Sequence, residues 1–249
     1  MKNALCVLSL ALFALLSVET PAATLVVANA SFELPAFADA SFGQQFITPA
    51  QQGGYGWSFT DASGIYNPTA LDYSGAGGSG TPAGGTGAQV AFSVQRYALF
   101  QTLAGMDGAL GNGDDPVLTA LTTYTLTAAF GQRLPGNQFG ATPGGYSFEL
   151  LAGATVIAQE TDAIALTPGS FVERTITVDS ATLSPSLFGQ PLTIRLNSTV
   201  NQATAATDFD NVRLDAVTVP EPSTGSLLVV ATLGFARKRT GAGKSVQRS

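Results

Sequence analysis

The stretch SFVERTITV, residues 170–178, decides the fold class, because its side chains alternate in character along an extended chain. Successive side chains of a β-strand point to opposite faces. One face of this strand would carry Val172, Arg174, Ile176 and Val178, and the other Phe171, Glu173, Thr175 and Thr177. In PLTIRLN, residues 191–197, the side chains of Leu192, Ile194 and Leu196 point together in the same way. Both stretches predict β-strands that bury one face.

Short runs of the same kind extend outward from these two in both directions. About ten such runs, rich in β-branched and aromatic residues, are bounded by Gly, Pro and Asn, and no part of the body keeps a helical apolar period. We therefore expect one all-β domain over residues 24–218, an antiparallel β-sandwich. A barrel or a β-helix is the alternative, and no fixed repeat supports a β-helix.

The composition of this body excludes several chemistries. Residues 24–219 contain no Cys, His or Lys, and their five Arg against fifteen Asp and Glu give a net charge of −10. Without Cys and His there is no disulfide framework, zinc-thiolate site, imidazole base or Ser-His-Asp triad. An acidic, lysine-free surface repels phosphate backbones, so we expect no nucleic-acid partner. Calcium, which takes carboxylate and carbonyl oxygens, remains possible.

Two glycine-rich loops carry patterns with a possible chemical meaning. Gly75, Gly77 and Gly80 form a G-x-G-x-x-G pattern, but Pro82 and a strand-like run follow it, so we expect no nucleotide there. The loop AGMDGALGNGDDP, residues 104–116, brings Asp107, Asp114 and Asp115 together, which indicates either a solvated turn or a calcium loop.

The first 23 residues have the pattern of a secretory signal peptide. Lys2 precedes an apolar run over residues 4–16, and small residues follow near a cleavage point after Ala22 or Ala23. An uncleaved anchor is the alternative. The single cysteine, Cys6, would leave with the signal helix.

The C-terminal tail, residues 219–249, has three parts in a fixed order. Pro220, Glu221 and Pro222 precede an apolar segment over residues 223–236, and a basic end over residues 237–249 begins with Arg237, Lys238 and Arg239. This order resembles the PEP-CTERM sorting signal of Gram-negative bacteria. The resemblance implies a C-terminal apolar helix held in the inner membrane, removal by an exosortase-type membrane peptidase, and delivery to the cell surface or extracellular matrix. The apolar segment is short, since fourteen helical residues span about 21 Å of the roughly 30 Å of hydrocarbon.

The body resembles the jelly-roll, galactose-binding-like domains of carbohydrate-binding modules, especially those similar to families 4 and 9. The resemblance is carried, in order, by NASFE (29–33), YGW (55–57), FQTL (100–103), TTYTLTAAFG (122–131) and DFDNVRLDAV (208–217). It implies that the first and last strands lie near each other and share a structural Ca²⁺. The implied ligands are Glu33 and Asp210, with Asn29 supplying a further oxygen.

Aromatic side chains suggest where a sugar would bind. Tyr55, Trp57, Tyr66 and Tyr73 gather in one segment and would present flat faces to the C–H faces of a sugar ring. Trp57 alternates with Gly56 and Ser58 on a predicted strand, so a place in the core competes with the exposed one.

These features together predict an exported, non-enzymatic surface or exopolysaccharide-matrix protein that associates with carbohydrate. A structural or adhesive sandwich without a sugar site is the first alternative. The second is a polysaccharide hydrolase, which needs two carboxyl groups across a cleft. Its candidates are Glu149, Glu160, Asp162 and Glu173, and no motif selects a pair among them.

Overall fold

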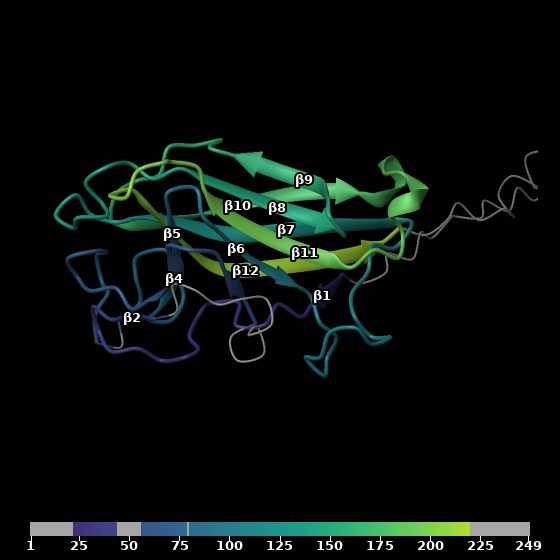
Figure 1. The fold of residues 1–249 in the computed structure, drawn as a ribbon, viewed down its shortest axis with the longest axis horizontal. Coiled ribbons are helices and arrows are strands. Elements are labelled where there is room, and N and C mark those ends of the chain that lie inside the picture. The colour runs from purple at the N-terminus through teal and green to yellow at the C-terminus, as the bar shows by residue number, and fades with distance from the viewer. Residues whose placement is uncertain (1–21, 44–55, 79, 220–249) are drawn as a thin grey trace, which may run out of the picture. The chain divides into compact units, whose positions relative to one another are not determined.

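The computed structural model describes residues 22–43, 56–78 and 80–219, and over these residues the fold is all-β, as predicted (Figure 1). One sheet contains β1 (Ala23–Leu25), β2 (Phe42–Gly43), β4 (Ser63–Tyr66), β5 (Val90–Val94), β7 (Thr122–Gln132), β10 (Ser170–Asp179) and β12 (Ala206–Thr218). The second sheet contains β3 (Ser58–Phe59), β6 (Ala98–Thr102), β8 (Tyr146–Ala152), β9 (Thr155–Thr161) and β11 (Leu192–Ser198). Two short 3₁₀ turns, η2 (Ser180–Thr182) and η3 (Pro185–Leu187), precede β11.

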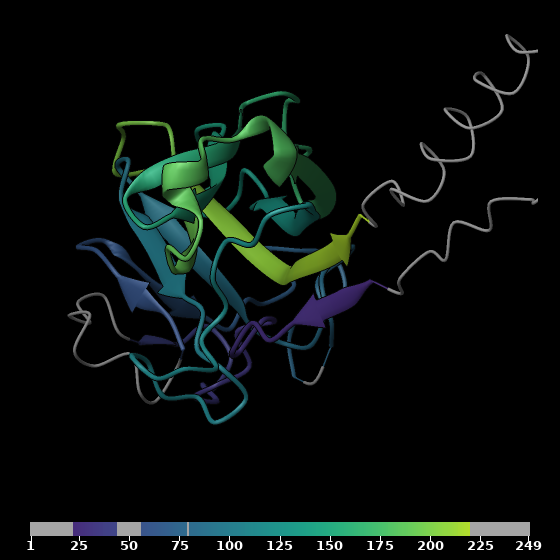
Figure 2. The same ribbon diagram turned by 90° about the vertical axis from the view of Figure 1, so that its right-hand side faces the viewer.

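All pairs of named strands among the described residues are antiparallel. The first sheet has the order β10-β7-β12-β5-β4-β2, and the second the order β3-β6-β11-β8-β9. Strand β1 pairs with β12, where Ala23 lies opposite Ala216, so the two ends of the domain run side by side (Figure 2). This neighbourhood of first and last strands agrees with the jelly-roll expectation.

The core lies between the two sheets and uses the alternation that the sequence predicts. In β11 the side chains of Leu192, Ile194 and Leu196 are buried in it. The ring of Phe130, on β7 of the first sheet, stacks at 4.3 Å on the ring of Tyr146, on β8 of the second. Such aromatic contacts across the interface join the sheets.

The outer face of the first sheet carries a second, smaller apolar cluster. On β5 the side chain of Ala91 belongs to the main core, whereas Val90 and Phe92 belong to the outer cluster. On β12 Phe209 enters the main core, and Asp208 and Asp210 on either side of it therefore point to the outer face. The polar side chains Asp208 and Asp210 therefore lie on this outer face and not in the interior of the sandwich.

Residues 1–21 of the predicted signal peptide and residues 220–249 of the predicted sorting tail fall outside the described residues. Within residues 22–43, 56–78 and 80–219, no helix has the length and apolar character needed to cross a membrane.

Candidate functional site

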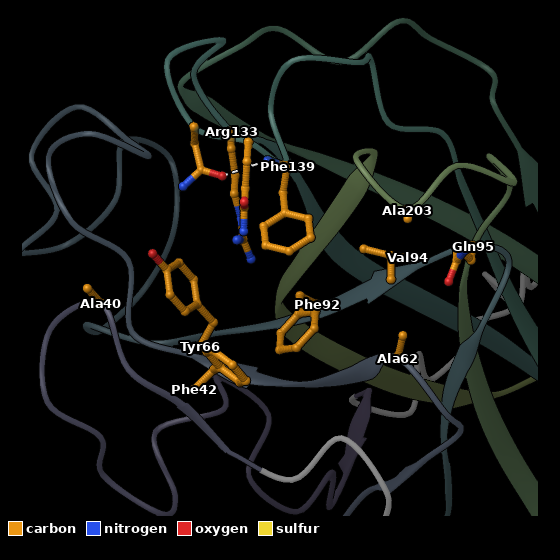
Figure 3. A pocket seen from close by; sticks show the side chains of 12 residues that line it. Ala40, Phe42, Ala62, Tyr66, Phe92, Val94, Gln95, Arg133, Phe139 and Ala203 are labelled. Carbon is orange, nitrogen blue, oxygen red and sulfur yellow. Dashed lines mark hydrogen bonds between the residues drawn. The ribbon is translucent and has the colours of Figure 1, made fainter.

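A cavity of about 400 Å³ opens on the outer face of the first sheet (Figure 3). Its walls come from β2, β4 and β5 and from the loop that follows β7. The side chains that define it are Phe42, Tyr66, Phe92, Arg133, Asn137 and Phe139. Its size and its largely aromatic wall are typical of sites for small organic molecules.

The position of Arg133 follows from a buried ion pair at the end of β7. Its Nε donates to Oδ2 of Asp208 at 2.8 Å, and its Nη2 donates to Oδ1 at 2.9 Å. Asp208 is fully buried and Arg133 only 3% exposed. Burial opposes the charge on the guanidinium, but the adjacent Asp208 carboxylate raises the pKa of Arg133 overall. The bidentate geometry therefore holds a permanent cation in one orientation.

A tyrosine completes the surroundings of Asp208, and a glycine makes room for it. The hydroxyl of Tyr73 donates to Oδ2 of Asp208 at 2.7 Å. Gly131 lies opposite Asp208 in the β7–β12 register, and a Cβ at that position would come within 2.6 Å of the Tyr73 hydroxyl. Any side chain at position 131 would displace the Tyr73 hydroxyl, so a glycine there allows Tyr73 to reach the Asp208 carboxylate.

The guanidinium of Arg133 projects among three aromatic rings at the cavity wall. Its Cζ atom lies 4.2 Å from the centre of the Tyr66 ring, 5.7 Å from that of Phe92 and 5.6 Å from that of Phe139. These distances allow cation–π attraction. Nη1 makes no hydrogen bond to a described residue. A fully buried nitrogen without a partner would be unsatisfied, and Nη1 is not one of the unsatisfied buried atoms. Because Arg133 lines the cavity, this partly accessible nitrogen is open to it.

A second buried carboxylate fixes Tyr66. The Tyr66 hydroxyl donates to Oδ2 of Asp72 at 2.7 Å, and Asn137 donates to the other carboxylate oxygen. Burial and then this hydrogen bond raise the pKa of Tyr66 above its ordinary value, so the phenol stays protonated. The same Asn137 amide accepts from the backbone N–H of Phe139, which ties the aromatic wall to the Asp72 network.

The predicted sugar-binding aromatics do not form an exposed platform. Trp57 and Tyr73 are both fully buried. Trp57 packs on Phe32 with ring centres 5.1 Å apart and donates to a backbone oxygen, and Tyr73 is held by Asp208. Tyr66 alone of the three described residues reaches the cavity, and Tyr55 lies outside the described residues. Their burial leaves no ring face for a sugar at Trp57 or Tyr73.

The structure brings two of the three predicted calcium ligands to one loop. Oε1 of Glu33 accepts from the backbone N–H groups of Ala88 and Gln89 at 2.9 and 2.8 Å. Asp210 accepts from the backbone and hydroxyl of Thr86, three residues before Gln89. Burial raises the pKa of Asp210 to about 7, the Thr86 hydrogen bonds oppose the rise, and the Glu33 charge adds to it. The two carboxylates are therefore near neighbours with no basic side chain between them.

Asn29, the third predicted ligand, has a different role. Its side chain donates to the carbonyl of Leu34 at 2.6 Å and accepts from the Leu34 N–H at 3.0 Å, so both amide atoms are used in holding a turn. Across the part of the chain that the structure describes, no three His, Cys, Asp or Glu side chains gather into a metal site.

The hydrolase candidates lie away from the cavity. Glu149, Glu160 and Glu173 each pair with an arginine, Arg195, Arg174 and Arg213 respectively. Asp162 accepts from the backbone of Tyr146 and from the hydroxyl of Thr199. None of these carboxylates lines the cavity, so no acid–base pair for sugar hydrolysis faces it.

The comparison with protein families decides the classification. The family model described as HpiC1-like, HpiC1 cyclase, matches residues 23–215. The chain belongs to the HpiC1-like cyclase family. The match covers all but the last three residues of the predicted domain, residues 24–218.

Solved structures agree with this assignment. A Stig cyclase, Fisc from Fischerella sp. TAU, in complex with (3Z)-3-(1-methyl-2-pyrrolidinylidene)-3H-indole, is 27% identical, with a TM-score of 0.61 over 80% of this chain and 100% of that one. A cyclase from Fischerella sp. TAU in complex with 4-(1H-indol-3-yl)butan-2-one is 28% identical, with a TM-score of 0.59 over 80% and 99% of the two chains. No curated protein matches the sequence.

Membership of the HpiC1-like cyclase family corrects the functional prediction. The expected non-enzymatic matrix protein associated with exopolysaccharide is wrong, because the family and the Fischerella cyclases are enzymes. The resemblance to carbohydrate-binding modules holds for the β-sandwich alone. A CBM4 structure also matches, with 15% identity and a TM-score of 0.32, and this likeness carries no argument about function.

Apart from Tyr66, the residues that line this cavity are not among those predicted from the sequence. Asp208 is recognisable in the sequence as sharing a face with Asp210, but no sequence feature links it to Arg133, seventy-five positions away. One available signal is that Arg133 is among only five arginines in the body and directly follows a long strand.

Proposed function

We propose that this HpiC1-like protein closes a ring within a small aromatic substrate that it holds in the cavity lined by Tyr66, Phe92, Arg133 and Phe139. The observation that carries the proposal is the aromatic cavity of about 400 Å³, found in a chain whose family consists of cyclases. The indole ligands of the two Fischerella cyclases support an indole-like ring as the aromatic part of the substrate.

The geometry favours catalysis by confinement. An intramolecular ring closure is slow when a flexible chain must find one folded arrangement, and a fitted apolar site supplies that arrangement in advance. The aromatic wall provides shape and excludes water. The phenol of Tyr66 stays protonated, and its hydrogen bond to Asp72 keeps the ring in place.

Calorimetric titration of the purified chain with 4-(1H-indol-3-yl)butan-2-one tests the assignment of the cavity. Ala62 lines the cavity, and Ala62→Trp would fill much of it. Ala109, on an exposed loop outside the cavity, provides the matched control Ala109→Trp. We expect binding by wild type and Ala109→Trp and none by Ala62→Trp. Equal binding by all three would place the ligand elsewhere and refute the assignment.

Turnover requires a second experiment. Ring closure without loss of atoms gives a product with the mass of the substrate and a different chromatographic retention. We expect such a conversion from a set of alkenyl-substituted indoles with wild type, and none with Ala62→Trp. Conversion by both proteins at equal rates would exclude the cavity as the active site.

We propose, in addition, that Ca²⁺ binds near Glu33 and Asp210. The supporting observation is that these two buried or partly buried carboxylates hold the same loop and no arginine neutralises them. Hard oxygen ligands of this kind suit calcium, which would add charge compensation and rigidity to the loop. Asn29 does not fit as a side-chain ligand, since both of its amide atoms are used by Leu34.

We propose that the protein is exported. The support is the signal-like segment over residues 1–23 and the tail over residues 219–249, which resembles a PEP-CTERM signal and implies an exosortase-type peptidase as a partner at the inner membrane. Fractionation of cells that produce the tagged protein tests this: export predicts a shortened chain outside the cytoplasm, and a full-length chain in the cytoplasm contradicts it.

A further inference from the structure

The polar groups behind the cavity leave a single strong donor at its inner wall. Arg133 uses Nε and Nη2 on Asp208, and Tyr66 uses its hydroxyl on Asp72. The Asn137 amide uses its nitrogen on Asp72 and its oxygen on the Phe139 N–H. Among the described lining residues, Gln95 and Gln138 are exposed side chains at the rim. The guanidinium of Arg133, through the two N–H groups of Nη1 and the second N–H of Nη2, is therefore the strong donor that a bound molecule meets.

We propose that Nη1 of Arg133 donates a hydrogen bond to a neutral acceptor on the substrate, such as a carbonyl oxygen or an imine nitrogen. The proposal rests on the cyclase function proposed above and names the class of its substrate: a flat aromatic ring that bears an uncharged acceptor. A charged donor binds such an acceptor more strongly than a neutral donor does.

The charges behind the wall exclude an ionised acceptor. The buried network contains one guanidinium, that of Arg133, and two carboxyl groups, those of Asp208 and Asp72. A substrate carboxylate at Nη1 would be attracted by the guanidinium, but the two carboxyl groups behind it, those of Asp208 and Asp72, would oppose a further negative charge. A substrate ammonium would instead meet the guanidinium first. A neutral acceptor avoids both repulsions.

The same hydrogen bond would assist ring closure. As a bond forms to a carbon conjugated with a carbonyl or imine, electron density moves toward the acceptor atom. A fixed cation at that atom stabilises this charge more in the transition state than in the ground state. The two hydrogen bonds to Asp208 already hold the guanidinium in one orientation, so it needs little movement to stabilise the charge in the transition state.

Three indoles of nearly equal size test the proposal. They are 3-acetylindole with a neutral acceptor, 3-ethylindole with none, and indole-3-carboxylate with an anionic one. Their affinities for the purified chain are measured by calorimetry. We expect 3-acetylindole to bind about tenfold or more tightly than 3-ethylindole, and indole-3-carboxylate to bind more weakly than 3-acetylindole.

The matched variants replace each of two ion pairs by neutral residues. Arg133→Met with Asp208→Asn removes the donor and keeps an acceptor for Tyr73, whereas Arg174→Met with Glu160→Gln removes a bidentate pair outside the cavity. We expect the first double variant to bind 3-acetylindole no more tightly than 3-ethylindole, so that the preference seen with wild type is lost. The second should keep that preference. Circular dichroism checks that both are folded.

Each other outcome has a distinct meaning. If wild type binds 3-acetylindole and 3-ethylindole equally, the role of Arg133 is refuted while the aromatic cavity stands. Tighter binding of indole-3-carboxylate overturns the requirement for a neutral acceptor. If none of the three indoles binds, the proposed function itself fails.

Discussion

The guanidinium carbon of Arg133 lies 4.2 Å from the centre of the Tyr66 ring, on the outer face of the seven-stranded sheet. Each of the two side chains is fixed by its own buried carboxylate, Asp208 for the arginine and Asp72 for the tyrosine. The pair therefore forms a wall whose position depends on two carboxylates that do not line the cavity.

The ion pair between Arg133 and Asp208 should behave as a unit. Removal of one partner leaves an uncompensated buried charge, so Arg133→Met and Asp208→Asn should each lower the free energy of unfolding by about 3 kcal/mol or more. The double variant should lose less than the two single variants together. Urea denaturation of the four proteins measures this coupling, and strictly additive losses would show that the pair is not coupled.

The absence of a side chain at Gly131 should also matter for stability. A methyl group there would press on the Tyr73 hydroxyl and the Phe171 ring, so Gly131→Ala should destabilise the fold by about 1–3 kcal/mol. Gly136 has no atoms within 4 Å of a Cβ placed on it and provides the control. Equal thermal melting of Gly131→Ala and Gly136→Ala would show that Tyr73 has room to move.

Sequence patterns were sufficient for the fold because burial alternates along the long strands. The period of two in residues 170–178 and 191–197 is a local property, and Leu192, Ile194 and Leu196 enter the core as predicted. The alternation around Trp57 also allows this residue a place in the core, and the structure shows it fully buried there. Tertiary packing, absent from a local pattern, decides which aromatic residues remain exposed.

Local sequence patterns could not predict the site, because its residues come from distant parts of the chain. Tyr73 and Asp208 meet across 135 positions, and Arg133 reaches Asp208 across 75. Tyr73 stands among Gly and Ser, which favoured an exposed loop, but its hydroxyl finds a buried carboxylate. Composition indicates an acidic body, but it could not show that Asp208 has an arginine partner whereas, among the described residues, no arginine pairs with Asp210.

The loss of stability as the pH falls into the acid range should depend in part on Glu160. The hydrogen bond from Arg174 lowers its pKa below the ordinary 4.5, burial opposes this, and Tyr146 adds to it. A lowered folded pKa stabilises the protein above pH 4.5, and this contribution is lost as the pH falls through the folded pKa. Glu160→Gln should therefore lower stability at neutral pH by up to about 1 kcal/mol and make no difference in strong acid. A loss that persists unchanged in acid would contradict this account.

Calcium should act through Asp210. Because the folded pKa of Asp210 is raised to about 7, its contribution to stability without metal falls as the pH rises from the ordinary 3.8 to about 7. A bound cation must displace that proton, so calcium should raise the melting temperature more at pH 8 than at pH 6. Asp210→Asn should remove most of the response. A melting temperature that is the same in calcium and in chelator would refute the calcium proposal.

The most direct test of the central claim is a crystal structure of the chain with 3-acetylindole. The account predicts the indole ring in the cavity between the walls formed by Tyr66, Phe92 and Phe139, with the carbonyl oxygen at hydrogen-bonding distance from Nη1 of Arg133. A ligand bound at another surface, or one that lies in the cavity with its carbonyl turned away from Arg133, would contradict it.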